Sequence, residues 1–320
     1  MQAKIIENTT IYVLEPHIEE YLWGGTKLRD NYYKNSNSNF VGETWELSCH
    51  PAGETMIKGT DLSLSDLFLN YRKKFGANLE NYEEFPLLVK LIDAKEDLAI
   101  QVHPDDDYAL KYEGQSGKNE MWYIVDCEKD SYVYCGFIKE FSETEFLLAI
   151  ENGTIVNKLK KIKVQKGDSF YIPAGTVHAI GSGCLVAEVQ QNSNLTYRIF
   201  DFYRRNLKGE LNELHIEKAR DVINLKPSRE YNFAPHLVNT KYFIVDLIKV
   251  IENKQIYVDE KSFRHLLALD GPVKLSTNKQ SVELNKGEGA FVSASTGELI
   301  LEGETEVLCS YIDKQEDSLN

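Results

Sequence analysis

Short β-rich segments separated by turn residues run through most of this chain, and this pattern constrains the fold more than any other feature. Three of them are LAIQVHPDD at 98–106, GKNEMWYIV at 117–125 and YIPAGTVHAI at 171–180. Closely spaced strands of this kind favour a barrel or jelly roll over a parallel sheet alternating with helices. With 320 residues, the chain is long enough for one large domain or two ordinary ones. We therefore predict a mainly β fold.

Three segments interrupt the strands with helical signals. Ser63 precedes an apolar helical face and Gly76 follows it, which indicates a capped helix. Ser142 and Glu145 form a second capping-box pattern. Apolar residues at helical spacing also occupy about 211–224. We expect these to be packing helices without chemistry of their own.

A domain boundary is predicted near 227–240, where Pro, Asn and Ser cluster. Beyond it the chain returns to short strands, and residues 287–300 align without gaps on residues 167–180. Both segments have a Gly-acid turn, a strand and a second turn. We predict two β-barrels of one type, with a catalytic domain at 1–232 and a C-terminal domain at 233–320.

The same register suggests that the second barrel has no metal ligands. It places Glu298 opposite His178 and Arg264 near the position of Glu120. We expect the C-terminal barrel to cover apolar surface of the first and to wall one side of its pocket.

The charge balance excludes several classes of partner. The formal net charge is -14 and the isoelectric point about 5.1, which argues against nucleic acid and anionic membranes. No signal peptide and no apolar run long enough for a membrane span is evident.

The five cysteines are scattered and lack C-x-x-C spacing, so we expect free thiols and a cytoplasmic protein.

Four polar residues within the predicted strands form a candidate metal site: Gln101, His103, Glu120 and His178. Residues two apart on a strand point from the same face, so Gln101 and His103 can act together. A single buried histidine is more often a core residue than a ligand. Two imidazoles with a carboxylate and an amide oxygen, however, form a hard-to-borderline ligand set. The sequence therefore indicates a metalloenzyme.

The surroundings of His178 are similar to the second metal motif of cupin barrels. Gly167 and Asp168 begin a tight turn, a strand follows, and Gly175 precedes the histidine. The first cupin motif usually has two histidines two apart and then a glutamate, and here Gln101 replaces the first histidine. Because the amide and both imidazoles are neutral and only the glutamate is charged, a bound divalent ion keeps a net charge of about +1. Without a thiolate, the set favours zinc over copper, although iron, manganese and cobalt also suit it.

Six ordered runs resemble type I mannose-6-phosphate isomerase, and most closely its short bacterial class. The runs are YLWGGTKL (21–28), GETWELSCHP (42–51), FPLLVKLIDAKEDLAIQVHPDD (85–106), GKNEMWYIV (117–125), PAGTVHAIGSG (173–183) and QQNSNLTYRIFDFYR (190–204). The resemblance implies a cupin-type scaffold with one zinc ion per chain. It also implies interconversion of mannose 6-phosphate and fructose 6-phosphate, which proceeds through a cis-enediolate.

The resemblance also implies roles for individual residues. Gln101, His103, Glu120 and His178 match the zinc ligands of the family. Arg198, Lys118 and Glu188 match catalytic or pocket residues, and Lys90 and Trp23 match residues that contact substrate. Ala99 stands where longer members have a serine thought to touch the phosphate, and the longer members' Asn-His-Lys-Pro-Glu signature is missing.

Several assignments stay open at this point. The carbon base is Glu188 or Lys118, or Glu188 only orients Arg198 or Lys118 in an ion pair. Cations at the pocket mouth are expected to bind the phosphate group. The candidates are Lys90, Arg198 and Lys118, and Arg204 and Arg205 are weaker candidates.

Two other functions compete with the isomerase. A non-catalytic sugar-phosphate-binding cupin protein would keep the barrel without turnover, and a cupin dioxygenase would hold iron. The partner we expect is a small sugar phosphate, without nucleic acid, membrane or an obligate protein partner.

Overall fold

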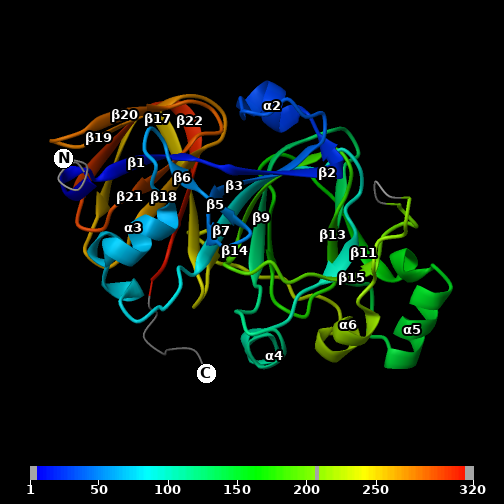
Figure 1. The fold of residues 1–320 in the computed structure, drawn as a ribbon. Coiled ribbons are helices and arrows are strands. Elements are labelled where there is room, and N and C mark those ends of the chain that lie inside the picture. Colours follow the sequence, from blue (N-terminus) through cyan, green and yellow to red (C-terminus); the bar gives the residue numbers. More distant parts are fainter. Residues whose placement is uncertain (1–5, 206–208, 314–320) are drawn as a thin grey trace.

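The computed structural model describes residues 6–205 and 209–313, and strands dominate it (Figure 1). Its three larger sheets have five, six and nine strands. The mainly β fold expected from the sequence is confirmed. Among the described residues, hydrogen bonding leaves each sheet open and does not close it into a continuous barrel.

Two sheets pack face to face in the first part of the chain and enclose the site described below. The six-stranded sheet contains, in order, β12 (Ser169–Ile172), β9 (Glu120–Cys127), β14 (Cys184–Gln191), β7 (Leu87–Asp93), β3 (Val41–Leu47) and β2 (His17–Gly25). The five-stranded sheet contains β11 (Leu159–Lys163), β10 (Tyr132–Phe137), β13 (His178–Ile180), β8 (Ile100–Val102) and β15 (Tyr197–Phe200). Ile92 and Trp122 of the first sheet pack with Val133 and Ile180 of the second in one apolar cluster.

The nine-stranded sheet combines the C-terminal strands with two strands from the N-terminal part of the chain. Its members are β16 (Val238–Asn239), β17 (Ile244–Val258), β18 (Arg264–Ala268), β19 (Val273–Ser276), β20 (Ser281–Leu284), β21 (Gly289–Val292), β22 (Gly297–Tyr311), β1 (Ile11–Glu15) and β6 (Met56–Ile57). Figure 1 shows β1, in blue, beside these orange and red strands, and Tyr12 pairs with Phe291. The division at 232/233 stays a prediction, and the first strand of the chain lies across it.

Aromatic packing and a hydrogen bond from a buried lysine join the two parts of the molecule. Phe75 contacts Phe291 with ring centroids 4.6 Å apart, and Phe85 contacts Phe263 at 5.4 Å. Lys34 Nζ lies 2.7 Å from Glu46 and donates a 2.5 Å hydrogen bond to the Gly287 carbonyl.

Short helices cover the sheets where the capping signals occur. Ser63 caps α3 (Leu64–Asn70) and Ser142 caps α5 (Glu143–Glu151), each in a capping box, which confirms both predictions. Asp105 caps α4 (Asp106–Tyr112). The remaining short elements are α2 (Lys27–Tyr32), η1 (Arg72–Lys74), η2 (Ala77–Leu79), η3 (Ile155–Lys158) and the hairpin strands β4 (Cys49–His50) and β5 (Gly53–Glu54).

The third predicted helix is shorter than the prediction of about 211–224. α6 spans Ile216–Val222, and the five residues before it are not helical. Leu211 instead forms a β-bridge with Arg205, and Asn212 donates a hydrogen bond to Asp201. These contacts hold the start of the segment out of the helix, against its helical periodicity.

The two similar segments have similar backbones. Gly167 has a φ of 94° and Gly287 one of 82°, at equivalent positions before β12 and β21. Eight residues further on, Gly175 and Ser295 have φ values of 84° and 62°. The equivalent side chains differ, since His178 is fully buried and Glu298 is exposed.

None of the helices within 6–205 and 209–313 is long and apolar enough to cross a membrane. All five cysteines are free thiols.

Candidate active site

The four candidate ligands come together between the two facing sheets. Gln101 lies on β8 and His103 directly follows that strand, while Glu120 begins β9 and His178 begins β13. β13 pairs with β8 so that His178 lies opposite Gln101. Residues far apart in the sequence therefore meet because the sheets bring their strand ends together.

The distances within this group are short. Glu120 Oε2 lies 3.3 Å from His103 Nε2, and Glu120 Oε1 lies 3.2 Å from His178 Nε2. The Gln101 amide is 3.2 Å from the same His178 nitrogen. The ligand atoms of His103, Glu120 and His178 all lie within 4.8 Å of one another.

Backbone carbonyls fix the orientation of both imidazoles. Nδ1 of His103 lies 2.7 Å from the Leu195 carbonyl, and Nδ1 of His178 lies 2.8 Å from that of Thr176. A carbonyl only accepts, so each Nδ1 carries the proton and each Nε2 keeps a lone pair. Both lone pairs face Glu120, an arrangement that metal-binding histidines usually show.

The protonation states also suit a metal site. Burial, with the charge of Lys118, lowers the pKa of His103 to about 3, and burial also lowers the pKa of His178. Burial opposes ionisation of Glu120, but Lys118 and the two imidazoles hold the pKa of this carboxyl well below its usual range. At neutral pH the group therefore consists of two neutral imidazoles and a carboxylate.

These residues fit a divalent ion. Glu120 Oε2 has the Lys118 ammonium 3.0 Å away, but His103 Nε2 and Glu120 Oε1 are buried and have no hydrogen-bond partner within the described residues. Such atoms cost free energy unless something else satisfies them. Metal–ligand bonds of about 2.0–2.1 Å in a tetrahedron place ligand atoms about 3.3 Å apart, close to the separations seen here. A half-turn of the Gln101 amide presents its oxygen in place of the nitrogen.

Lysines and carboxylates alternate beside the candidate metal site. Lys118 Nζ lies 3.0 Å from Glu120 Oε2. Lys90 lies opposite Glu188 in the pairing of β7 with β14, and its Nζ is 3.2 Å from Glu43 and 3.6 Å from Glu188. Burial, with the charge of Glu120, raises the pKa of Glu188. Burial opposes the charge on Lys90, but Glu43 and Glu188 raise its pKa above the usual range.

A pocket of about 720 Å³ opens over these groups. Six of the nine predicted site residues line it: Trp23, Lys90, Gln101, Lys118, Glu188 and Arg198. The other three, His103, Glu120 and His178, are buried next to Gln101 and Lys118. Ala99 also lines the pocket. The structure therefore brings together every residue that the sequence proposed for the site.

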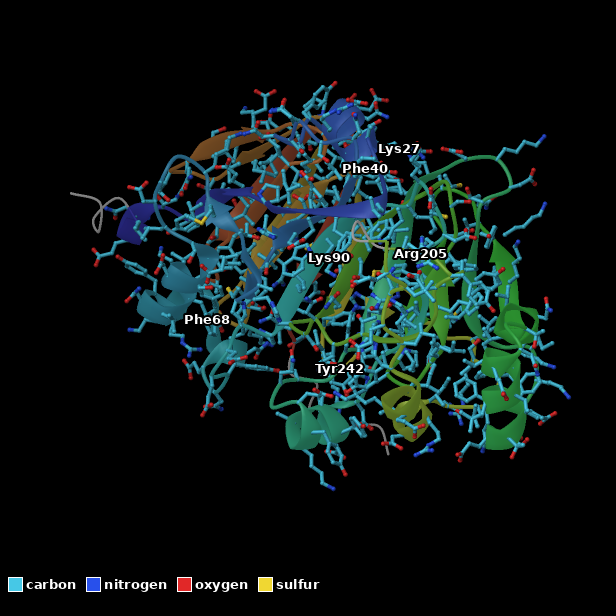
Figure 2. The ribbon with its side chains drawn as sticks, turned by 45° about the vertical axis from the view of Figure 1, so that its right-hand side comes forward. Lys27, Phe40, Phe68, Lys90, Arg205 and Tyr242 are labelled. Carbon is cyan, nitrogen blue, oxygen red and sulfur yellow. The ribbon has the colours of Figure 1, made fainter. Side chains whose placement is uncertain are left out.

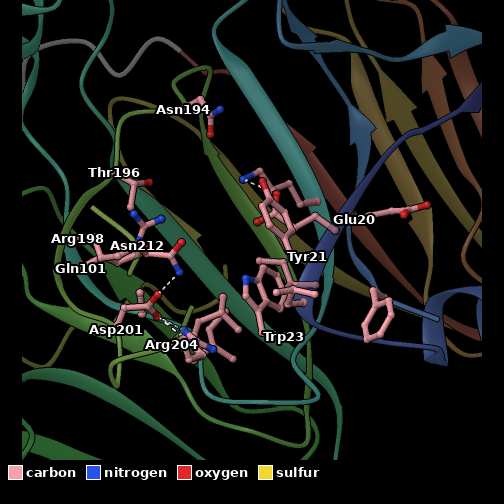
Figure 3. A pocket seen from close by; sticks show the side chains of 18 of the residues that line it. Glu20, Tyr21, Trp23, Gln101, Asn194, Thr196, Arg198, Asp201, Arg204 and Asn212 are labelled. Carbon is pink, nitrogen blue, oxygen red and sulfur yellow. Dashed lines mark hydrogen bonds and ion pairs between the residues drawn. The ribbon is translucent and has the colours of Figure 1, made fainter. Parts of the chain in front are cut away.

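An aromatic pair forms one wall of the pocket (Figure 3). Tyr21 and Trp23 stack with centroids 4.8 Å apart and planes 9° apart. A Cβ on Gly42 would lie within 3.0 Å of both rings, so this glycine lets the pair approach β3. Sequence reasoning identified Trp23 but missed Tyr21, although both belong to the YLWGG run.

The opposite wall carries arginines (Figure 3). Arg198 lies on β15 opposite Gln101, and its Nη1 donates a 3.0 Å hydrogen bond to the Glu213 carbonyl. Arg204 and Arg205, which the sequence analysis ranked below the other cations, also line the pocket. Other lining residues that it missed are Glu43, Asn194, Thr196, Asp201 and Asn212.

Comparisons with known proteins identify the family of this chain. Residues 11–148 match the family model for the catalytic domain of type I phosphomannose isomerase, and residues 234–312 match the mannose-6-phosphate isomerase cupin domain. The probable mannose-6-phosphate isomerase GmuF of Bacillus subtilis is 38% identical over 313 residues, covering 93% of this chain and 98% of the relative.

Solved structures resemble the chain over nearly its full length. The mannose 6-phosphate isomerase of Bacillus subtilis has a TM-score of 0.88 and 32% identity, covering 94% of this chain and 99% of that one. A zinc-bound mannose 6-phosphate isomerase has a TM-score of 0.76 at 16% identity, covering 95% and 100%. The predicted cupin-type architecture is confirmed. With the matches to both family models and to a relative of 38% identity, the chain belongs to the type I mannose-6-phosphate isomerases, a family of aldose–ketose isomerases.

Proposed function

We propose that this isomerase interconverts mannose 6-phosphate and fructose 6-phosphate with one zinc ion per chain, through a cis-enediolate. The observation that carries the proposal is the buried group of His103, Glu120 and His178, whose ligand atoms all lie within 4.8 Å of one another. Two of these atoms, His103 Nε2 and Glu120 Oε1, have no hydrogen-bond partner among the described residues. Gln101 completes the proposed ligand set. The zinc-bound structural neighbour supports the choice of metal.

The reaction moves a proton from C2 to C1 of the sugar and places negative charge on its oxygens. A zinc ion at this site supplies Lewis-acid stabilisation of that charge, worth several kcal/mol. Lys118 lies at the same end of the pocket, held 3.0 Å from Glu120, and its ammonium can donate to a substrate oxygen. Its anchoring fixes this donor before substrate arrives.

Arg198 adds a second fixed positive charge at the same end. Its strand position opposite Gln101 places it beside the proposed ligands, and the Glu213 carbonyl holds one arm of its guanidinium. We assign Arg198 to the oxygen that gains charge in the transition state.

Glu188 is the proposed carrier of the C2 proton. It lines the pocket, and Trp122 Nε1 donates a 2.8 Å hydrogen bond to its Oε2. Burial and the charge of Glu120 raise its pKa. A carboxylate with a raised pKa is a stronger base at neutral pH than one with an ordinary pKa. Lys118 is already paired with Glu120, so we assign it hydrogen bonding and not proton abstraction.

Lys90 and Trp23 contact the substrate in this proposal. Lys90 is fixed between Glu43 and Glu188, so its charge is balanced and its remaining donor capacity suits sugar hydroxyls. Trp23 offers an apolar face at the pocket wall, against which the ring carbons can pack.

Turnover of mannose 6-phosphate in deuterated water tests the reaction. An enediolate exchanges its proton with a base, so we expect deuterium at C1 of the fructose 6-phosphate that forms. Product that stays free of deuterium over many turnovers would contradict a Glu188 carrier that exchanges with solvent and would favour direct transfer of hydrogen from C2 to C1. Tight sugar-phosphate binding without any product would instead support the alternative, a non-catalytic binding protein.

A further inference from the structure

The lysines of the pocket are already neutralised by carboxylates. Lys118 is paired with Glu120, and Lys90 lies between Glu43 and Glu188. A phosphate that approached Lys90 would meet two carboxylates at the same place, which favours a different cation for that group.

The arginines of the opposite wall differ in their partners. Asp201 accepts hydrogen bonds from Nε and Nη2 of Arg204, and the carbonyl of Asp97 accepts one from its Nη1. Arg198 and Arg205, by contrast, have no carboxylate within ion-pair distance among the described residues. The hydrogen bonds that their guanidinium groups make within the described part of the chain go to backbone carbonyls, that of Glu213 for Arg198 and that of Gly209 for Arg205. Among the described residues, these two guanidinium groups therefore carry the positive charge of the pocket that no carboxylate balances.

Arg205 directly follows a strained turn. The Arg204 amide donates a 2.9 Å hydrogen bond to the Asp201 carbonyl, which closes a four-residue turn directly after β15. Its central residues, Phe202 and Tyr203, have φ values of 52° and 57°, the pattern of a type I′ turn. Glycine and asparagine usually occupy such positions, and bulky residues there cost about 1–3 kcal/mol each.

The surroundings of the turn hold this unfavourable backbone in place. Phe200 contacts the rings of both Phe202 and Tyr203 at 5.3 Å. Asn212 Nδ2 donates to Asp201 Oδ2, the oxygen that Arg204 leaves unused, and Figure 3 shows this Asp201–Arg204–Asn212 cluster at the pocket wall. Backbone strain supported in this way concentrates at functional sites.

The turn separates the two unpaired arginines along the chain. Arg198 lies opposite Gln101 inside the sheet, whereas Arg205 follows the turn, is exposed, and forms a β-bridge with Leu211 (Figure 2). One guanidinium is therefore beside the proposed metal ligands and the other is on the solvent side of the pocket. A sugar phosphate likewise has a reacting end and an anionic end that keeps contact with water.

We propose that Arg205 binds the phosphate group of the substrate, and that the Asp201–Arg204–Asn212 cluster is a positioning device that aims it into the pocket. The inference rests on the proposed function, because it assumes a sugar phosphate. A guanidinium with free donors binds phosphate in a bidentate manner. Arg205 would supply a contact that Ala99 does not.

The test compares Arg205→Ala and Arg205→Lys with Arg220→Ala, an exposed arginine of α6 outside the pocket. We expect Arg205→Ala to raise KM for mannose 6-phosphate about 10- to 100-fold with a much smaller change in kcat. It should weaken competitive inhibition by inorganic phosphate by a similar factor. Arg205→Lys keeps the positive charge but loses the bidentate guanidinium, so its KM should lie between those of Arg205→Ala and the unmodified chain. Arg220→Ala should have the same KM as the unmodified chain.

Two outcomes would overturn the assignment. In the first, the KM and the phosphate inhibition constant of Arg205→Ala both stay within about twofold of those of the unmodified chain. The other is weaker phosphate inhibition with an unchanged KM, which would reveal a separate site for free phosphate. Calorimetric binding of mannose 6-phosphate keeps the proposed function distinct. If the unmodified chain binds without turnover and Arg205→Ala loses affinity, the isomerase proposal fails and the phosphate assignment holds.

Discussion

Buried histidines in the two parts of the molecule are built differently. His178, between the facing sheets, has Nδ1 bonded to a carbonyl and Nε2 aimed at Glu120. His265, on β18 of the C-terminal sheet, is equally buried, but neither ring nitrogen has a hydrogen-bond partner in the described residues. Burial alone therefore does not make a ligand. A ligand needs one nitrogen anchored and a second donor group opposite the other.

The same contrast runs through the two similar segments. Both have a glycine with positive φ before the strand and a second positive φ eight residues later. The backbone that aims His178 inward is thus present before β22, but there the equivalent Glu298 is exposed. The fold repeats the scaffold, and the side chains decide which copy carries chemistry.

Matched substitutions of the two histidines should give the largest difference. His178→Leu removes a proposed ligand, so we expect activity to fall at least about 1000-fold and metal content to drop. His265→Leu should retain activity and metal. The measurements are initial rates on mannose 6-phosphate and metal content of the purified variants. Equal losses in both variants would mean that the His178 effect is structural.

The buried Lys34–Glu46 ion pair, whose lysine also donates to the Gly287 carbonyl of the C-terminal part, should matter for stability and not for chemistry. Lys34→Met leaves Glu46 buried without its cation, and we expect the free energy of unfolding to fall by about 3–5 kcal/mol. The double variant Lys34→Met/Glu46→Gln should recover most of this loss. Urea unfolding measures both variants, and a loss below about 1 kcal/mol in Lys34→Met would contradict the stabilising role of the pair.

Glu188 and Glu43 provide a control for the proposed proton carrier, because both contact Lys90. We expect Glu188→Gln to lower kcat about 100- to 1000-fold and Glu43→Gln to have a much smaller effect. Glu188 must be ionised to accept a proton, so activity should fall as pH falls through its raised pKa. The Glu188→Gln profile should lose that limb. Equal effects of the two variants on kcat would reduce Glu188 to a partner of Lys90.

The smallest effect is expected at His265. Burial, with the charge of Lys34, lowers its pKa from 6.5 to about 3. Between those values the unfolded chain binds a proton that the folded chain excludes, so stability is complete above pH 6.5 and falls as pH drops. His265→Leu removes this acid-induced loss of stability, which is about 2 kcal/mol at pH 5. The free energy of unfolding of the variant should therefore depend less on pH. Urea titrations at pH 5 and 7 measure the free energy of unfolding of the variant and of the unmodified chain. The same change between the two pH values in both proteins would contradict the lowered pKa of His265.

Local signals explain why the helix caps and the clustered residues of the candidate metal site could be predicted from sequence. Ser63 and Ser142 act on residues three positions away, and Gln101 and His103 are separated by one residue on the same strand. The motif around His178 likewise lies in one continuous segment. Patterns of this length do not depend on the rest of the fold.

Long-range pairing explains what could not be predicted. Glu43 reaches Lys90 only because β3 pairs with β7, and β1 joins the C-terminal sheet across 276 or more residues of chain. The helical periodicity of 211–224 was overridden at its start by contacts with Asp201 and Arg205. A sequence gives no direct signal for contacts of this kind.

The central claim is that the four residues at the sheet ends hold a metal on which the reaction depends. Its most direct test is to measure metal content and mannose 6-phosphate turnover of the same sample before chelation, after it, and after zinc is restored. We predict one metal ion per chain, loss of turnover on removal and recovery with zinc. Undiminished turnover by a chain shown to be free of metal would contradict the account.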